Sequence, residues 1–384
     1  MEKHHSIDNH LKLTLVNLLF NNIKNMKETP LINIHKELNA NLVDFAGYTM
    51  PVYYSSALKE HKRVRESLGI FDVSHMGQII IYGQDAMKFI QRITTNNVTK
   101  LLVGKAQYTL LLNEEGGVID DLIIYKLKED KFMLVVNAAN IEKDYNWILR
   151  CKATENIHIE NISDRMALIA LQGPMALQAL ENITSKDLAT TPYYSFIESY
   201  IADVKNIIIS VTGYTGAGGF ELYVNNADAE KLWKTIMEAG EKYNILPAGL
   251  AARDSLRLEK GYCLYGHEIT EKINPLEAKL SWVVDFAKDF IGKEALLKIK
   301  GTGIEKTLVG ITAMGRSIPR QGDIIISEKG DTIGVITSGG FSPILERPIA
   351  MGYINKNSLD KHTKILIKSR NKEMQAVLTK IPFV

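Results

Sequence analysis

The most constraining feature of this sequence is a hairpin pattern that carries two adjacent aspartates. An apolar run at residues 108–112 is followed by the turn sequence Asn-Glu-Glu-Gly-Gly at 113–117 and by a second run at 118–125 that is rich in Val and Ile. The two glycines permit positive φ angles without steric cost, and the flanking runs have the composition of strands. The stretch therefore predicts an antiparallel β-hairpin.

Asp120 and Asp121 interrupt the second apolar run. Aspartate is depleted in strands, and a charge that faces a core is costly unless it is paired. Strand alternation sends the two side chains to opposite faces, so one of them can face water while the other faces inward. The inward carboxylate either caps a neighbouring turn or belongs to a functional site, because buried ionisable groups are often functional.

Charge and cysteine content exclude several classes of function. The chain has 384 residues, enough for two or three domains, and its 46 basic and 44 acidic residues leave a net charge of +2. That balance argues against a nucleic-acid binder that relies on a positive face. Cys151 and Cys263 form no CxxC or His/Cys cluster, so neither a metal site nor a disulfide framework is predicted. A reducing, cytoplasmic location fits this pattern.

Residues 1–25 differ in composition from the rest of the chain. They hold a short apolar patch at 11–20 among Asn, His and Lys, and they contain no Arg. The patch is too short to span a bilayer, and no small-residue cleavage site follows it. We therefore expect no membrane anchor, signal peptide or transit peptide, and interpret residues 1–25 as a non-native or disordered extension before a folded part that begins at Met26.

Helix and strand patterns alternate up to about residue 272. The predicted helices cover residues 34–38, 56–68, 85–93, 141–152, 175–180, 227–243 and 250–260, and the predicted strands include 71–83, 132–137, 166–171 and 207–211. Residues 45–54 read as a loop punctuated by Gly47 and Pro51. Alternation on this scale favours an α+β fold with antiparallel sheets that carry helices on one face.

Short β runs at close spacing begin near residue 305 and continue to the end of the sequence. Turn sequences such as 328–331 and 339–340 separate them. This pattern is typical of a small all-β sandwich or barrel, with its boundary within residues 273–306.

A second isolated carboxylate follows a glycine-rich loop. Gly213, Gly216, Gly218 and Gly219 allow the backbone to approach a ligand closely, but the loop lacks a phosphate-binding fingerprint. Glu221 comes next, within a predicted strand. It is either an edge-strand residue that faces water or a ligand-binding group.

Three cationic or titratable side chains leave similar alternatives open. Arg253 and Arg257 lie one helical turn apart, which fits either a binding pair or a solvated helix face. His75, in the sequence FDVSHMG, is either a ligand or base, or a hydrogen-bonding structural residue.

These residues together resemble a known family, the aminomethyltransferases (T-proteins) of the glycine cleavage system. The resemblance covers residues 27–384 and is carried, in order, by FAGYTMPVYY, FDVSHMG, NEEGGVIDDLIIY, LQGP, TGYTG with GFE, GLAARDSLRLEKGYCLYGHEI and KIPFV. It implies an α+β fold with two folate-binding α+β lobes and a C-terminal β-barrel around a central funnel. The implied limits are 26–75 with 165–272 for the first lobe, 76–164 for the second, and 273–384 for the linker and barrel.

The resemblance also implies a reaction and its partners. T-proteins take an aminomethyl group from the lipoyl arm of H-protein and transfer its methylene to tetrahydrofolate, which gives 5,10-methylenetetrahydrofolate, ammonia and dihydrolipoyl H-protein. Lipoylated H-protein and folate are therefore the expected partners, with tetrahydrofolate as acceptor substrate and no nucleic acid or membrane.

Site residues follow from the matching motif positions. Asp121 matches the acid near folate N5 and N10 and is the expected catalytic residue, whereas Asp120, on the other strand face, is expected to serve structure by accepting hydrogen bonds. Glu221 matches the carboxylate that accepts both donors of the pterin edge. The remaining expected folate-binding residues are Arg253, Tyr108, Tyr125 and Asn137.

Two departures and two rival interpretations accompany the resemblance. Val211 and Ala217-Gly218 replace an Arg and a Glu-Asp pair that are frequent in the family. One rival is a folate-binding protein of iron–sulfur cluster assembly without transferase activity. Those proteins carry KGCYxGQE, whereas this chain has KGYCLYGHE, with Cys263 displaced by one position and His267 in place of Gln. The other rival, a demethylase lobe for sarcosine or dimethylglycine, usually accompanies a flavin domain, and this sequence has no dinucleotide fingerprint.

Overall fold

The predicted hairpin is formed by β6 (Ala106–Leu112) and β7 (Val118–Lys128). The structure is a computed structural model that describes residues 26–359, 364–369 and 372–384. The interpretation of residues 1–25 as an extension lies outside the described residues. The strands pair antiparallel with Leu110 opposite Asp121, and the register shifts between Leu111 and Leu112.

A five-stranded sheet contains this hairpin at one end. Its order is β6-β7-β8-β5-β9, with β8 at Lys131–Val136, β5 at Gly77–Tyr82 and β9 at His158–Asn161. Two helices, α4 (Ala86–Ile93) and α5 (Ile141–Cys151), supply buried Phe89, Ile90 and Ile148 to a core that also holds Leu122 and Ile124 of β7. Leu122 and Ile124 therefore face the helices, as the alternation predicts for this part of β7.

A six-stranded sheet forms the second layer. Its order is β11-β12-β13-β10-β4-β14, with bounds Phe196–Ile201, Val204–Ser210, Gly219–Asn225, Met166–Gln172, Gly69–Asp72 and Leu246–Pro247. One face packs on α2 (Ile32–Glu37), α6 (Ala176–Leu180) and α7 (Ala229–Gly240), with Trp233 fully buried. A separate core joins Leu168 and Tyr223 of this sheet to Tyr125 and Val135 of the five-stranded sheet.

Two local predictions in the N-terminal part need correction. Residues 45–54 are not a loop, because β2 (Asn41–Phe45) and β3 (Tyr48–Tyr53) pair antiparallel around Gly47, whose φ is +80°, and β1 (Lys27–Glu28) joins them. Residues 71–83 do form strands, but β4 belongs to the six-stranded sheet and β5 to the five-stranded one. The chain crosses between the sheets at residues 73–76.

The C-terminal part is a closed barrel, as the β runs predict. Its order is β15-β18-β17-β16-β19-β20, with bounds Lys306–Ala313, Arg347–Asn355, Thr332–Ser342, Ile324–Ile326, Lys364–Ser369 and Lys372–Thr379. The preceding linker contains a short 3-10 turn at Ser281–Val283 and the helix α9 (Lys293–Thr302), which the sequence pattern did not predict.

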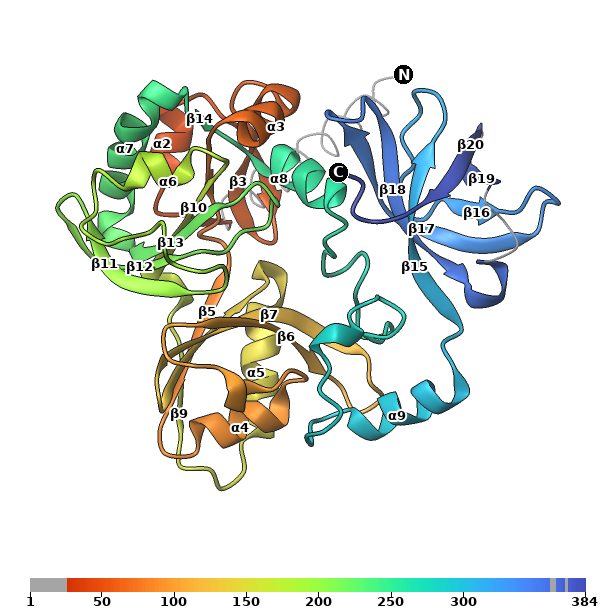
Figure 1. Ribbon diagram of the computed structural model, residues 1–384, viewed down its shortest axis with the longest axis horizontal. Helices are drawn as coiled ribbons and strands as arrows, with labels where there is room; N and C mark the ends of the chain where they lie inside the picture. The colour runs from red at the N-terminus through yellow and green to blue at the C-terminus, as the bar shows by residue number, and fades with distance from the viewer. Residues whose placement is uncertain (1–25, 360–363, 370–371) are drawn as a thin grey trace, which may run out of the picture.

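Helix α8 (Leu250–Glu259) lies between the part that holds the six-stranded sheet and the barrel (Figure 1). It contacts β3 and α3 (Ala57–Glu66) on one side and β17 and β18 of the barrel on the other. The last two residues of the chain, Phe383 and Val384, donate backbone hydrogen bonds to the carbonyl of Glu259. The α+β fold with a C-terminal barrel is thus confirmed, whereas the limits proposed for the two lobes stay a prediction.

Candidate active site

Asp121 accepts two hydrogen bonds from neighbouring strands of the five-stranded sheet. The Tyr108 hydroxyl on β6 donates to Oδ2 at 2.9 Å, and the Asn137 amide, directly after β8, donates to Oδ1 at 2.8 Å. The side chain is only partly exposed. Burial, followed by the charge of Asp120, raises the pKa of Asp121 to about 7, although both hydrogen bonds oppose the rise. Asp121 can therefore exchange a proton near neutral pH.

Asp120 is fully buried on the opposite face of β7. It accepts hydrogen bonds from the backbone N–H of Asn137 at 3.0 Å, from the Asn137 amide at 2.9 Å and from the Asn140 amide at 2.5 Å. The expectation that Asp120 accepts structural hydrogen bonds is confirmed. The expected division holds, since Asp120 is buried and Asp121 is partly exposed, but Asn137 at the strand end donates to both carboxylates.

An aromatic pair covers the Tyr108 side of Asp121. The Trp282 ring is stacked on Tyr108 with centroids 5.7 Å apart and an interplanar angle of 20°. Trp282 is 66% exposed, which is unusual for so large an apolar side chain. No sequence pattern indicates Trp282, because it lies in the linker segment without periodic apolar residues around it.

Glu221 lies in an interior strand and not at a sheet edge. β13 is hydrogen-bonded to β12 on one side and to β10 on the other, and Glu221 is 8% exposed. The edge-strand alternative is therefore wrong. The Thr212 hydroxyl donates to Oε2 at 2.5 Å. Burial raises the pKa of Glu221, while Thr212 and the Arg253 charge act in the opposite direction.

A chain of hydrogen-bonded hydroxyl groups leads to the Glu221 carboxylate. Tyr223 donates to the Tyr125 hydroxyl at 2.9 Å, which lies 3.2 Å from the Thr212 hydroxyl. One direction satisfies the chain, from Tyr223 through Tyr125 and Thr212 to Glu221. Tyr125 is fully buried between the two sheets and is connected to Glu221 through Thr212. Its predicted contact with folate stays a prediction.

The two arginines of α8 have different surroundings. Arg253 lies over the Tyr214 ring at 4.7 Å, and no salt bridge to it is found within the described ranges. Arg257 is 1% exposed and pairs with Glu268 at 2.9 Å and with Asp254 at 2.8 Å. A solvated face is therefore excluded for Arg257, and Arg253 is the arginine left available to a ligand.

His75 is buried close to Arg253. Its Nδ1 has no hydrogen-bond partner in the part of the chain that the structure describes, and Phe45 packs edge-on against the ring at 5.5 Å. Burial, followed by the Arg253 charge, lowers the pKa of His75 to about 4, so the imidazole is neutral at pH 7. The role of His75 as a ligand or base, or as a hydrogen-bonding structural residue, stays a prediction.

Electrostatic coupling connects these groups. The charge of Arg253 lowers the pKa of Glu221, and the pKa of Tyr214, raised by burial, responds to both Asp121 and Arg253. These effects indicate that Asp121, Arg253 and Glu221 lie near one another, with Tyr108 bonded to Asp121 and Tyr214 under the Arg253 guanidinium. Across residues 26–359, 364–369 and 372–384, no group of three His, Cys, Asp or Glu side chains could hold a metal ion. The arrangement suits a polar ligand with donors at one end and a proton to transfer at the other.

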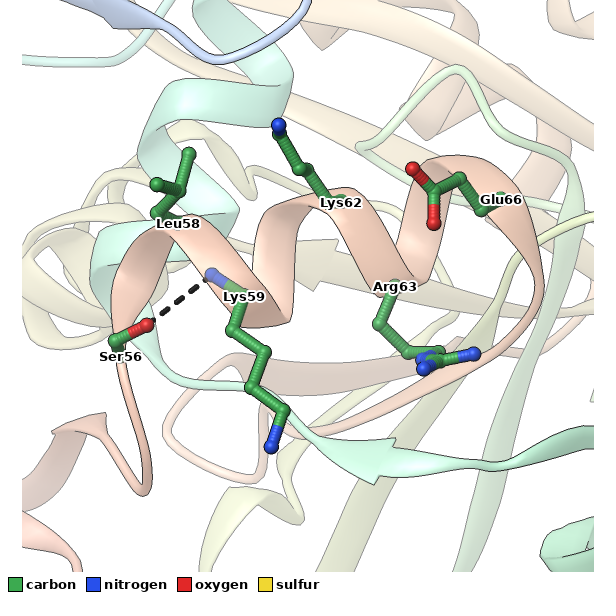
Figure 2. A pocket seen from close by; sticks show the side chains of 6 residues that line it. All are labelled: Ser56, Leu58, Lys59, Lys62, Arg63 and Glu66. Atoms are coloured by element: carbon green, nitrogen blue, oxygen red, sulfur yellow. Dashed lines mark hydrogen bonds between the residues drawn. The ribbon is translucent and has the colours of Figure 1, made fainter.

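A separate hollow of about 350 Å³ lies on the outer face of α3 (Figure 2). Its lining comes from one helix and its N-cap, where Ser56 accepts a hydrogen bond from the backbone N–H of Lys59 at 3.2 Å. Its lining residues are Ser56, Leu58, Lys59, Lys62, Arg63 and Glu66. None of the six predicted site residues lines it, so we do not assign the activity to this hollow.

None of the described helices combines the length and apolar character that crossing a bilayer requires.

Comparison with known proteins identifies the family. The model described as GCVT N-terminal domain matches residues 31–288, and the one described as glycine cleavage T-protein C-terminal barrel domain matches residues 306–384. The chain is 47% identical to an aminomethyltransferase of Bacteroides thetaiotaomicron over 360 residues, which is 93% of this chain and 99% of that protein. It is 48% identical to the aminomethyltransferase of Halothermothrix orenii, covering 94% and 100%. The solved glycine cleavage system aminomethyltransferase T of Bartonella henselae superimposes with a TM-score of 0.87 at 33% identity, covering 94% and 98%. The chain therefore belongs to the glycine cleavage T-protein family.

Proposed function

We propose that this protein is the tetrahydrofolate-dependent aminomethyltransferase of a glycine cleavage system. Its donor is the aminomethyl group on lipoylated H-protein, and its acceptor is tetrahydrofolate. The observation that carries this proposal is the state of Asp121, a half-buried carboxylate held by Tyr108 and Asn137 with its pKa raised to about 7. Such a group accepts a proton at neutral pH and stabilises a nearby cation.

The reaction breaks two bonds at the methylene carbon and forms two. The C–S bond to the lipoyl group and the C–N bond to ammonia break, and bonds to N5 and N10 of the folate form. The two folate N–H protons end on the departing sulfur and nitrogen. Asp121 would accept and return a proton near N5 and N10, and its charge would favour the cationic stage of the transfer.

Glu221 and Arg253 would hold the folate at the other end. A pterin offers a 2-amino group and an adjacent N3–H, and a carboxylate accepts from both at once. Glu221 is held by Thr212 in the buried interior strand, which fits that role. Arg253, with Tyr214 under its guanidinium, would bind a carbonyl or carboxylate oxygen of the substrate.

The rival interpretation is a folate-binding protein of iron–sulfur cluster assembly. The relatives described above carry the aminomethyltransferase name, which favours the transferase. The test combines purified protein, aminomethyl-loaded H-protein and tetrahydrofolate, with ammonia as the readout. Ammonia release that requires all three components supports the transferase. Folate binding without ammonia release would support the rival.

A further inference from the structure

Asp144 is a buried carboxyl group that accepts no hydrogen bond from the described residues. It is 0% exposed, and neither carboxyl oxygen receives a hydrogen bond from an N–H or O–H of the described residues. Its neighbour Lys143 is engaged elsewhere, with the carbonyl of Ile119 at 2.7 Å, the Tyr265 hydroxyl at 2.6 Å and Glu271 at 3.3 Å. A buried carboxylate without donors is costly, so the group is expected to keep its proton.

The group that Asp144 faces is Asp120. Asn140 is the N-cap of α5 and Asp144 follows it by four residues, so the two side chains lie on the same side of the helix start. Asn140 donates to Asp120 at 2.5 Å, and burial, followed by the charge of the same Asp120, raises the pKa of Asp144. Two neighbouring carboxyl groups that are both buried are expected to hold one proton between them. Asp120 already accepts three hydrogen bonds from N–H donors, so it is the anion, and Asp144 is the acid.

Asn137 connects this pair to the active site. Its single amide nitrogen lies 2.9 Å from Oδ1 of Asp120 and 2.8 Å from Oδ1 of Asp121. The position of Asp120 therefore sets the orientation of the Asn137 amide, and the amide sets the orientation of Asp121. The backbone N–H of Asn137, which also donates to Asp120, holds the strand end in place.

We propose that Asp144 is a neutral carboxylic acid that donates its proton to Asp120 and acts as a positioning residue for Asp121. The proposal rests on the catalytic role proposed for Asp121. It implies that the buried pair carries one negative charge and not two. The other titratable groups around the pair are Asp121 of β7, Tyr108 of β6, Lys143 of α5, and Tyr265 with Glu271 after α8.

Two substitutions separate the neutral acid from an ionised one. Asp144→Asn keeps the shape, the neutrality and a hydrogen-bond donor, so kcat should stay within about twofold of the wild type and the acid limb of the pH–rate profile should not move. Asp144→Ala removes the donor. Its kcat should fall about tenfold, the equivalent of one hydrogen bond to a charged group, with little change in the KM for folate.

An infrared difference spectrum tests protonation without relying on turnover. At pH 7 the wild type minus Asp144→Asn spectrum should contain the carbonyl stretch of a protonated carboxylic acid. The proposal is overturned if that band is absent or if Asp144→Asn loses as much kcat as Asp144→Ala. It is also overturned if Asp144→Asn moves the acid limb to lower pH, because such a shift requires the loss of a negative charge near Asp121. Full turnover in Asp121→Asn would instead overturn the proposed function and leave the infrared result intact.

Discussion

The Tyr108 hydroxyl lies 2.9 Å from Oδ2 of Asp121 and donates a hydrogen bond to it. The two residues lie on adjacent strands as diagonal neighbours, because Leu110 and not Tyr108 stands directly opposite Asp121. This bond favours the ionised form of Asp121 and so lowers its pKa, against the effect of burial. A tyrosine on the neighbouring strand thus lowers the pKa of the group that we propose as the catalytic base.

Tyr108→Phe should move the pH–rate profile. Because the carboxylate is the active form, kcat rises with pH through about 7 in the wild type. Loss of the hydrogen bond raises the pKa of Asp121, so the acid limb should shift upward by about one pH unit. The measurement is kcat for ammonia release from pH 5.5 to 9, in about half-unit steps that resolve such a shift. Tyr82→Phe, at an exposed tyrosine of β5, is the control and should leave the limb in place. An unmoved limb in Tyr108→Phe would contradict the assignment.

Asp121→Asn should change stability in a pH-dependent way. The folded-state pKa of Asp121 is raised above the unfolded value of about 3.9, so its contribution is fully present below that value and is lost as pH rises through about 7. The amide does not ionise and avoids this loss. The Tm of Asp121→Asn minus the Tm of the wild type should therefore be more positive at pH 8 than at pH 4. Equal Tm differences at the two pH values would mean that the Asp121 pKa is not raised.

Glu221→Ala should weaken folate binding. It would leave two pterin donors without acceptors in a closed site, and hydrogen bonds to charged groups contribute roughly 1.5–3 kcal/mol each. The affinity for tetrahydrofolate should fall at least about tenfold, which titration calorimetry can measure. Glu198→Ala, at an exposed position of β11 in the same sheet, is the matched control. Unchanged affinity in Glu221→Ala would assign Glu221 to the structure alone.

Arg253 and Arg257 allow a paired comparison on one helix. Arg257→Ala would leave buried Glu268 without its partner, and breaking a buried ion pair costs about 3–5 kcal/mol of unfolding free energy. Arg253→Ala breaks no salt bridge in the described part of the structure, so it should keep most of the stability and lose folate affinity. Chemical denaturation and calorimetry measure the two effects. A larger stability loss in Arg253→Ala than in Arg257→Ala would reverse the roles.

Much of the fold could be predicted because local patterns dominate it. The hairpin over β6 and β7, the helices α4 and α5 and the strands of the barrel follow from periodicity and turn residues. The segment around Gly47 could not be read in this way, because Pro51 is rare inside a strand and masked the β3 pattern. Helix α9 was missed because its sequence has a weak apolar stripe.

The site was predicted unevenly for a physical reason. Asp121 and Glu221 stand out because each is a charge within an apolar strand, and Arg253 follows from the family motif. Thr212, Tyr214 and Trp282 became evident only in three dimensions, since they act on residues distant in the chain. Asp144 reads as an ordinary polar residue of an amphipathic helix, and only its burial against Asp120 distinguishes it.

Ammonia release by Asp121→Asn and Asp120→Asn, each normalised to folded protein, tests the central claim most directly. Asp121→Asn keeps the shape of the side chain but cannot accept a proton, so turnover should fall by roughly 10²–10⁴ while folate affinity changes little. Asp120→Asn weakens the bonds from Asn137 and Asn140, so stability should suffer, and turnover per folded molecule should fall by no more than about tenfold because Asp120 acts on Asp121 only through Asn137. Equal losses of turnover in the two variants, or a larger loss in Asp120→Asn, would contradict Asp121 as the catalytic base.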